Sequence, residues 1–139
     1  MLIGLTGRIA AGKGTFVDYF KEKGFVGYTI SDAVKIEVSN LGLEITRENM
    51  QSVGNEFREQ YGAGIWARKI IETMNLNENS ILDGIRNPGE IEELRKVDNS
   101  ILIAIDAKQD LRYKRLLKRN KPSDSKTWEE FLKSDARDY

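Results

Sequence analysis

The feature that most constrains this chain is a glycine-rich loop between an apolar strand and a helix. Residues 1–6 form a short apolar run typical of a buried strand, and residues 15–23 carry apolar side chains at helical spacing. The segment between them, from Gly7 to Gly14, fits the pattern G-x-x-x-x-G-K, with Lys13 as its lysine. Without those flanking elements the pattern would indicate only a turn with a solvated lysine. With them it predicts a phosphate-binding loop, or P-loop.

Each part of the loop has a physical task. Glycines let backbone N–H groups point at phosphate oxygens, and the following helix presents the positive end of its dipole. Lys13 would reach the β and γ phosphates as a mobile point charge. Thr15 is the nearest hydroxyl for a phosphate or a metal, because Gly14 occupies the place where the strict motif has Ser or Thr. The predicted triphosphate-binding residues are Gly7, Ala10, Ala11, Gly12, Lys13, Gly14 and Thr15.

Composition narrows the chemistry further. The chain of 139 residues has no Cys and no His, which excludes thiolate metal sites and imidazole bases. Carboxylates, Lys, Arg, hydroxyls, backbone N–H groups and a hard cation remain, and these suit phosphoryl transfer. Lys plus Arg equals Asp plus Glu at 22 each, so the overall charge favours neither nucleic acid nor membrane binding. No apolar run approaches a membrane span, and we expect a cytoplasmic protein.

Strands and helices are expected to alternate along the chain, which predicts an α/β fold with a parallel sheet and crossover helices. The length fits one domain, residues 1–139. Strands are expected at 1–6, 25–30, 80–85 and 101–107. Helices are expected at 15–23, from Ser31 or Asp32 to Gly42, from Thr46 to 61, and at 65–74, 88–96, 110–120 and 127–138.

Asp83 is the main carboxylate candidate. It closes the third predicted strand, and the carboxyl ends of parallel strands face the same crevice as the P-loop. It could hold Mg2+ or orient an acceptor, or it could cap a loop or pair with Arg86. Arg86, Arg8, Arg58 and Arg68 could each grip an acceptor phosphate through a bidentate fork. For Arg58 and Arg68, a solvated surface charge is the equal alternative.

A basic run extends from Arg112 to Lys121. Arg112, Arg115 and Arg119 are spaced three and four apart, so one helical face carries all three. The run could be a solvated helix or a nucleic-acid patch, but beside a triphosphate it suits a lid whose arginines stabilise the transferred group. The large aromatic side chains Trp66, Trp128 and Phe131 are expected to pack rather than to stack on bases.

Several segments resemble a known family. The start from Leu2 to Thr15 resembles the P-loops of dephospho-CoA kinases and adenylate kinases, with Lys-Gly-Thr in the adenylate-kinase spelling. Ile81–Arg86 is similar to the adenylate-kinase segment Leu-Asp-Gly-Phe-Pro-Arg, and closer to an archaeal group related to dephospho-CoA kinase. Further segments that resemble this group are Ser31–Ala33, Gln51–Trp66, and Arg115 and Arg119 followed by Asp124, Phe131, Asp135 and Arg137. The middle part also resembles phage-type deoxynucleoside monophosphate kinases and, more loosely, phosphomevalonate kinase.

The resemblance implies a three-layer α/β/α nucleoside-monophosphate-kinase fold that uses ATP and Mg2+, with acceptor-binding helices in 31–75 and a lid in 110–138. Carried over, Lys13, Asp83, Arg115 and Arg119 serve catalysis. The implied metal residues are Thr15 and Asp83, and the implied acceptor residues are Arg8, Asp32, Arg58, Arg86 and Arg137. The acceptor would be a nucleoside monophosphate or a dephospho-CoA-type molecule.

Such folds normally continue past the lid with a fifth strand and a helix. Because the sequence stops at Tyr139, we expect either a fragment or a second chain over the exposed sheet edge, for example in a homodimer. Two other functions compete with a kinase. A GTPase switch is disfavoured, because Asn120-Lys121-Pro122-Ser123-Asp124 misses the guanine-binding spacing by one residue. A nucleotide-binding regulatory or degenerate protein without turnover stays open.

Overall fold

The computed structural model describes residues 1–120 and 126–137, and of Arg137 the backbone alone. The elements along the chain are β1 (Leu2–Gly7), α1 (Lys13–Glu22), β2 (Val26–Thr29), α2 (Ile30–Asn40), α3 (Arg47–Tyr61), α4 (Ile65–Glu72), β3 (Ser80–Asp83), α5 (Pro88–Arg95), β4 (Ser100–Ile105), α6 (Gln109–Arg119) and α7 (Trp128–Arg137).

The four described strands form one parallel sheet in the order β2-β3-β1-β4. β1 lies in the middle, paired with β3 on one side and β4 on the other. Because all strands run the same way, the P-loop after β1 and the end of β3 meet at one edge of the sheet. The α/β fold with a central parallel sheet, predicted from the alternation of elements, is confirmed.

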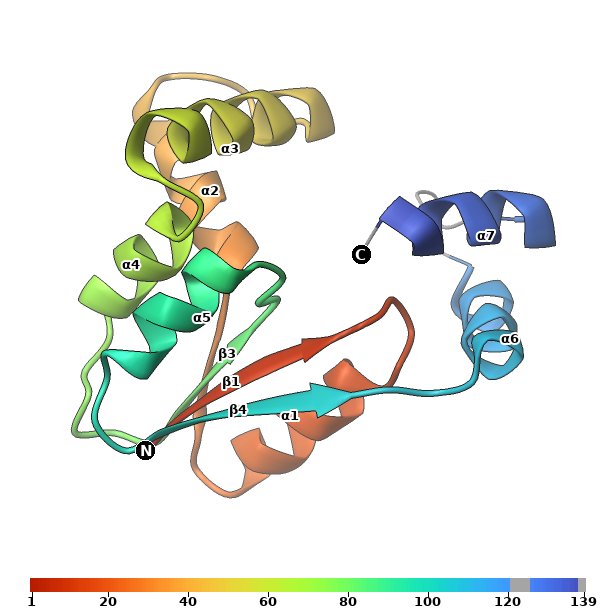
Figure 1. Ribbon diagram of the computed structural model, residues 1–139, viewed down its shortest axis with the longest axis horizontal. Coiled ribbons are helices and arrows are strands. Elements are labelled where there is room, and N and C mark those ends of the chain that lie inside the picture. The colour runs from red at the N-terminus through yellow and green to blue at the C-terminus, as the bar shows by residue number, and fades with distance from the viewer. Residues whose placement is uncertain (121–125, 138–139) are drawn as a thin grey trace.

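Both faces of the sheet are covered by helices. Leu2 and Leu82 pack with helices α2, α4 and α5, whereas Ile3, Leu5 and Ile81 pack on the other face with α1. Neighbouring strand residues therefore point to opposite faces, which is the period of a β-strand. Figure 1 shows α1 on one side of the sheet and α4 and α5 on the other, so the three-layer arrangement is also confirmed.

Several predicted element boundaries shift. The second helix begins at Ile30, and its N-cap is Thr29 rather than Ser31 or Asp32. Asp32 instead occupies the third helical position, where its carboxylate accepts the Thr29 backbone N–H at 3.1 Å in a capping box. The third strand ends at Asp83 rather than Ile85, because Gly84 turns with a φ of 94° and sends the Ile85 side chain into the core.

Helices α6 and α7 lie beyond the carboxyl end of β4, apart from the group formed by α2 to α5 (Figure 1). Within the described residues no strand follows β4, so β4 is an edge of the sheet. Its Ile101 side chain is exposed there. In the same part of the chain, none of the helices has the length and apolar character needed to cross a membrane.

Candidate active site

The P-loop is held in a shape that few residue types can adopt. Gly12 caps α1 with a φ of 109°, a left-handed conformation that glycine adopts without strain, and Ala10 has a φ of 59°. At Gly7 an added Cβ would lie 2.3 Å from the Ile105 carbonyl oxygen, so only glycine lets the loop leave the sheet this close to β4. The glycines at the two ends of the loop are therefore required by the backbone itself.

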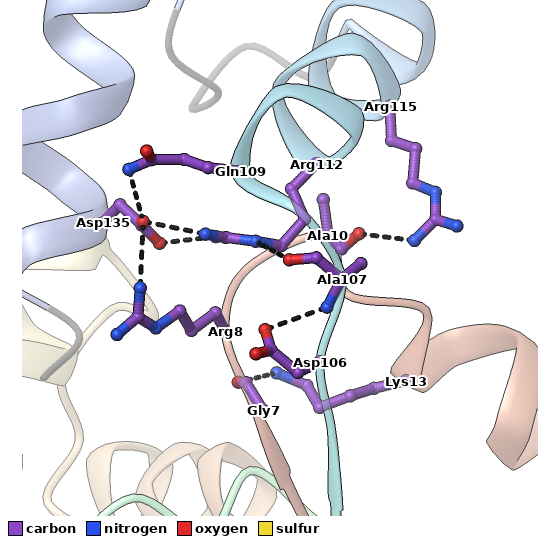
Figure 2. Close-up of polar contacts among 10 residues, drawn as sticks. All are labelled: Gly7, Arg8, Ala10, Lys13, Asp106, Ala107, Gln109, Arg112, Arg115 and Asp135. Carbon is purple, nitrogen blue, oxygen red and sulfur yellow. Dashed lines mark hydrogen bonds and ion pairs between the residues drawn. The ribbon is translucent and has the colours of Figure 1, made fainter.

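Lys13 is the first residue of α1, two residues earlier than the predicted start of this helix. Its amine donates a hydrogen bond to the Gly7 carbonyl at 2.8 Å, so the side chain folds back along the loop rather than into solvent (Figure 2). Lys13 also lines the main cavity, which lies at the carboxyl edge of the sheet. Its ammonium charge thus lies at the N-terminal end of a helix, where the helix dipole also favours an anion.

The two residues after Lys13 are both exposed. A Cβ added at Gly14 would meet nothing within 4 Å, so this position has room for the hydroxyl side chain of the strict motif. Thr15 lies outside the main cavity. The assignment of Thr15 to a metal therefore stays a prediction, without support from its position.

A cavity of about 580 Å³ opens at the carboxyl edge of the sheet. Its volume suits a ligand of nucleotide size, since ligand sites commonly enclose about 300–1,000 Å³. The cavity joins the P-loop lysine to side chains from α2, α3, β3 and α5. Its lining residues are Lys13, Thr29, Ile30, Ser31, Val34, Arg47, Met50, Gln51, Asn55, Arg58, Asp83, Gly84, Arg86, Asn87 and Glu90.

Asp83 lies at the end of β3 and lines this cavity. Its Oδ1 atom is buried and has no hydrogen-bond partner among the residues that the structure describes. A buried carboxylate oxygen without a partner is costly, so it needs an explanation such as an ion or a ligand hydroxyl. Pairing with Arg86, the structural alternative raised from the sequence, does not satisfy this oxygen.

The cavity carries an excess of positive charge. Four of its lining side chains are cationic, Lys13, Arg47, Arg58 and Arg86, against the two carboxylates of Asp83 and Glu90. The imbalance suits an anionic ligand, because guanidinium groups bind phosphate oxygens in bidentate geometry.

Glu90 is a buried carboxylate in the wall of the cavity, with only 1% of its surface exposed. It accepts hydrogen bonds from the Asn87 amide at 2.7 Å and from the Arg86 backbone N–H at 3.4 Å. Burial raises the pKa of Glu90, while the Arg86 backbone bond and the charges of Arg58 and Arg86 partly oppose the rise. Through its two hydrogen bonds, Glu90 fixes the segment that carries Arg86, just before the start of α5.

Other predicted site residues lie elsewhere. Arg115 donates to the Ala10 carbonyl at 3.0 Å, so it contacts the P-loop without lining the cavity. Arg119 is exposed at the end of α6. Arg68 pairs with Glu93 at 3.3 Å outside the cavity, and Asp32 belongs to the α2 capping box. The Arg137 side chain, like Lys121 and Asp124, lies outside the described residues.

The prediction that Arg112, Arg115 and Arg119 form one arginine face beside the triphosphate is wrong for Arg112. Arg112 is 1% exposed and forms a bidentate pair with the buried carboxylate of Asp135 on α7 (Figure 2). The helix turns this position inward because α7 packs there, with Phe131 fully buried beside Arg112. Arg112 is therefore an internal ion-pair partner, whereas Arg115 one turn later is exposed. The packing roles predicted for Trp66 and Phe131 are confirmed, since both are buried.

Sequence reasoning missed Arg47, Glu90 and the role of Asp135. Arg47 directly follows the α3 cap, Thr46, and nothing in its local pattern separates it from a surface arginine. Glu90 had a usable signal, because Asn87 and Glu90 have the spacing of a helix cap with its acidic partner. The role of Asp135 depends on its contact with Arg112, which lies 23 residues away in the sequence, and no local pattern reveals such a contact.

The donor set fits a magnesium nucleotide better than a metal caged by protein. Among residues 1–120 and 126–137 there is no group of three carboxylates that could hold a cation alone. A hard cation at this edge would have the Asp83 carboxylate on the protein side and phosphate oxygens on the other, as Mg2+ usually does. Gly12 and Lys13, at the N-terminal end of α1, are the P-loop residues that would face those phosphate oxygens.

Comparisons with known proteins identify the family and the fold of the chain. An AAA-domain family model matches residues 3–137. A UPF0200 protein of Pyrococcus abyssi is 33% identical over 145 aligned residues, which cover 99% of this chain and 78% of that protein. Among solved structures, the shikimate kinase from Acinetobacter baumannii has a TM-score of 0.56 at 16% identity, covering 96% of this chain and 71% of the kinase.

A chain of the Pnkp1/Rnl/Hen1 RNA repair complex has a TM-score of 0.62 at 14% identity, and the match covers 99% of this chain but 43% of that one. At these identities the structural matches establish the fold. The sequence matches establish the family: the chain belongs to the UPF0200 proteins, matches the AAA-domain model over nearly its whole length, and has the fold of the P-loop kinases.

Proposed function

We propose that the protein is an ATP-dependent small-molecule kinase that transfers the γ-phosphoryl group of ATP to a nucleotide-like acceptor of the nucleoside monophosphate or dephospho-CoA type. The observation that carries the proposal is one shared cavity. It is lined by Lys13 of the P-loop, by Asp83, whose buried Oδ1 atom has no hydrogen-bond partner in the described part of the chain, and by Arg58 and Arg86. Donor phosphate, cation and anionic acceptor can therefore meet in one place.

In this mechanism the P-loop amides and Lys13 bind the triphosphate and neutralise its charge. Mg2+, when bound, supplies further neutralisation of the phosphate oxygens. Asp83 orients either the cation or the attacking group of the acceptor. Arg58 and Arg86 hold the acceptor's own anionic group in the cavity, so that its nucleophile faces the γ phosphate. Most of the rate then comes from positioning and charge stabilisation.

The direct test measures ADP release and phosphorylated product together. ATP and Mg2+ are supplied with nucleoside monophosphates, with dephospho-CoA, or with no acceptor. A kinase forms ADP in step with a phosphorylated acceptor, whereas a nucleotide-binding regulatory protein forms neither product. ATP binding without turnover on any acceptor would therefore favour the regulatory alternative and end the kinase proposal.

The P-loop assignment is tested by Lys13→Ala, with Lys35→Ala as the matched control. Lys35 is an exposed lysine on α2 that lies outside the cavity. Loss of the Lys13 charge should lower turnover by about 10² to 10³, the usual effect of removing one charge-stabilising group. Melting temperature should stay near the wild-type value, because Lys13 contributes little packing. Turnover equal to that of Lys35→Ala would refute the assigned site.

Asp83→Asn separates chemistry from binding. Turnover should fall about 10²-fold while ATP affinity changes much less, because the carboxylate serves the cation or the acceptor. Asp98→Asn is the control, since Asp98 is exposed and outside the cavity. Equal losses of ATP affinity and turnover in Asp83→Asn would reassign Asp83 to a structural role.

A further inference from the structure

Asp135 has no part in the proposed mechanism, yet several side chains converge on it. It lies on α7, and 3% of its surface is exposed. Its carboxylate accepts hydrogen bonds from both terminal nitrogens of Arg112 and from the Gln109 amide at 3.1 Å. The hydrogen bonds from Arg112 lower the pKa of Asp135, although burial opposes them, so the group is held as a carboxylate.

One partner of Asp135 comes from the P-loop itself. The Arg8 guanidinium lies 3.6 Å from Asp135 Oδ2, and 38% of the Arg8 side chain is exposed. A second contact joins the same two regions, because Arg115 of α6 donates to the Ala10 carbonyl. Figure 2 shows both contacts beside the Lys13–Gly7 bond. The P-loop is therefore contacted at two residues, by α7 at Arg8 and by α6 at Ala10.

The buried pair also fixes the direction of α6. Arg112 donates through Nε to the Ala107 carbonyl at 3.0 Å, which anchors the chain between β4 and α6. Arg115 lies three residues after Arg112, on the neighbouring part of the helix surface. Holding Arg112 against Asp135 therefore determines where Arg115 meets the P-loop. Asp135 acts on Arg8 by direct contact and on Arg115 through the helix.

We propose that Asp135 is a positioning residue for phosphoryl transfer. It holds α6 and α7 against the P-loop and thereby positions Arg8, within the loop, and Arg115, which contacts the loop, for the bound triphosphate. Asp135 contacts Arg8 through an ion pair of 3.6 Å, whereas it accepts two hydrogen bonds from Arg112. This inference rests on the proposed kinase function.

The test compares Asp135→Asn with the wild-type chain by steady-state kinetics and by amide hydrogen exchange at residues 8–12. The amide is nearly isosteric but uncharged, so it holds the two arginines less firmly. In the folded variant kcat should fall about tenfold, with a smaller change in the dissociation constant of a non-hydrolysable ATP analogue. Exchange at residues 8–12 should become faster. Wild-type kcat together with wild-type exchange would overturn the proposal.

A double-mutant cycle with Arg8→Gln distinguishes positioning from plain stability. If Asp135 acts through Arg8, then Arg8→Gln should lower kcat in the wild-type chain and have little further effect beside Asp135→Asn. Additive losses would mean that Asp135 does not position Arg8. Ile70→Ala is the stability control, because Ile70 is buried on α4, a helix that packs against α2, α3 and α5. It should lower the melting temperature but leave the kcat of folded protein unchanged.

Two outcomes separate this inference from the function on which it rests. The wild-type chain could phosphorylate no acceptor while exchange at residues 8–12 still becomes faster in Asp135→Asn. In that case the kinase proposal fails, but the positioning of the P-loop by Asp135 is supported. If Asp135→Asn does not fold, Arg8→Gln and Arg115→Gln replace it, since neither removes the buried pair. Wild-type kcat in both of these variants would leave Asp135 with nothing to position and would overturn the inference.

Discussion

The two sides of the P-loop use arginine in opposite ways. On the cavity side Arg47, Arg58 and Arg86 line an open space together with Lys13, where they outnumber the carboxylates. On the α6–α7 side the Arg112 guanidinium is buried and matched by Asp135. Excess charge around a cavity attracts a ligand from outside, whereas a balanced buried pair holds helices together. Burial and partner, rather than residue type, decide whether an arginine serves binding or structure.

The largest expected effect is the difference in unfolding free energy between substituting Arg112 and substituting Arg115, one turn later on α6. Arg112→Leu leaves the Asp135 carboxylate buried without its main partner, which should cost about 3–5 kcal/mol of unfolding free energy. Arg115→Ala removes an exposed side chain that donates to the Ala10 carbonyl, which should cost about 1 kcal/mol or less. Urea unfolding of both variants measures the contrast. Similar losses in the two variants would contradict the distinction between a structural and an exposed arginine.

A smaller effect is expected on the cavity side. Arg58→Ala and Arg86→Ala should each raise the KM for the acceptor about ten- to hundredfold, the range expected for losing a hydrogen bond to a charged group. Their unfolding free energies should fall by less than that of Arg112→Leu, although both charges also favour the buried Glu90 carboxylate. Arg68→Ala is the matched control, because Arg68 forms a surface pair with Glu93 outside the cavity. A KM increase in Arg68→Ala equal to the other two would show that the cavity is not the acceptor site.

The smallest expected effects are changes in how stability depends on pH in acid. They have opposite signs for Asp135, on the α6–α7 side, and for Glu90, on the cavity side. The pKa of Asp135 is lowered by its bonds from Arg112, so the unfolded chain binds this proton first. The stability it contributes is present above the unfolded pKa and is lost as pH falls through the folded pKa. Asp135→Asn should therefore lose stability less steeply in acid than the wild-type chain.

Glu90 behaves in reverse, because burial raises its pKa and the folded chain binds this proton first. Protonation of Glu90 relieves a burial cost as pH falls through the raised pKa, so Glu90→Gln should lose stability more steeply in acid. Urea unfolding between neutral and acidic pH measures both slopes. Parallel slopes in the two variants would contradict the opposite electrostatic environments of the two carboxylates.

Local pattern was enough for much of the fold. The glycines of the P-loop, the alternation of strands with helices and the position of Asp83 at a strand end all follow from nearby residues. Such features depend on backbone conformation and on periodicity, which a short window of sequence contains. The prediction that Asp83 and the P-loop share a crevice also follows from local pattern, because parallel strands place their carboxyl ends together.

Contacts between distant segments could not be predicted in this way. Arg58 and Arg68 each had an equal chance of being a surface arginine, and only the packing of α3, α4 and α5 places Arg58 in the cavity and Arg68 outside it. The spacing of Arg112, Arg115 and Arg119 predicted that they share one helical face. Of these three residues, α7 buries only Arg112. Helical spacing shows which residues share a face but not what lies against it.

By itself, the sequence determined a parallel α/β fold with a phosphate cradle at its first turn and a carboxylate at the end of its third strand. These follow from backbone conformation and hydrophobic periodicity, which act within a few residues. The tertiary structure decided which charges line the cavity and which are buried as partners. That choice depends on the environment that distant segments create around each group, because the same guanidinium binds an outside anion in an open cavity and an internal carboxylate when covered.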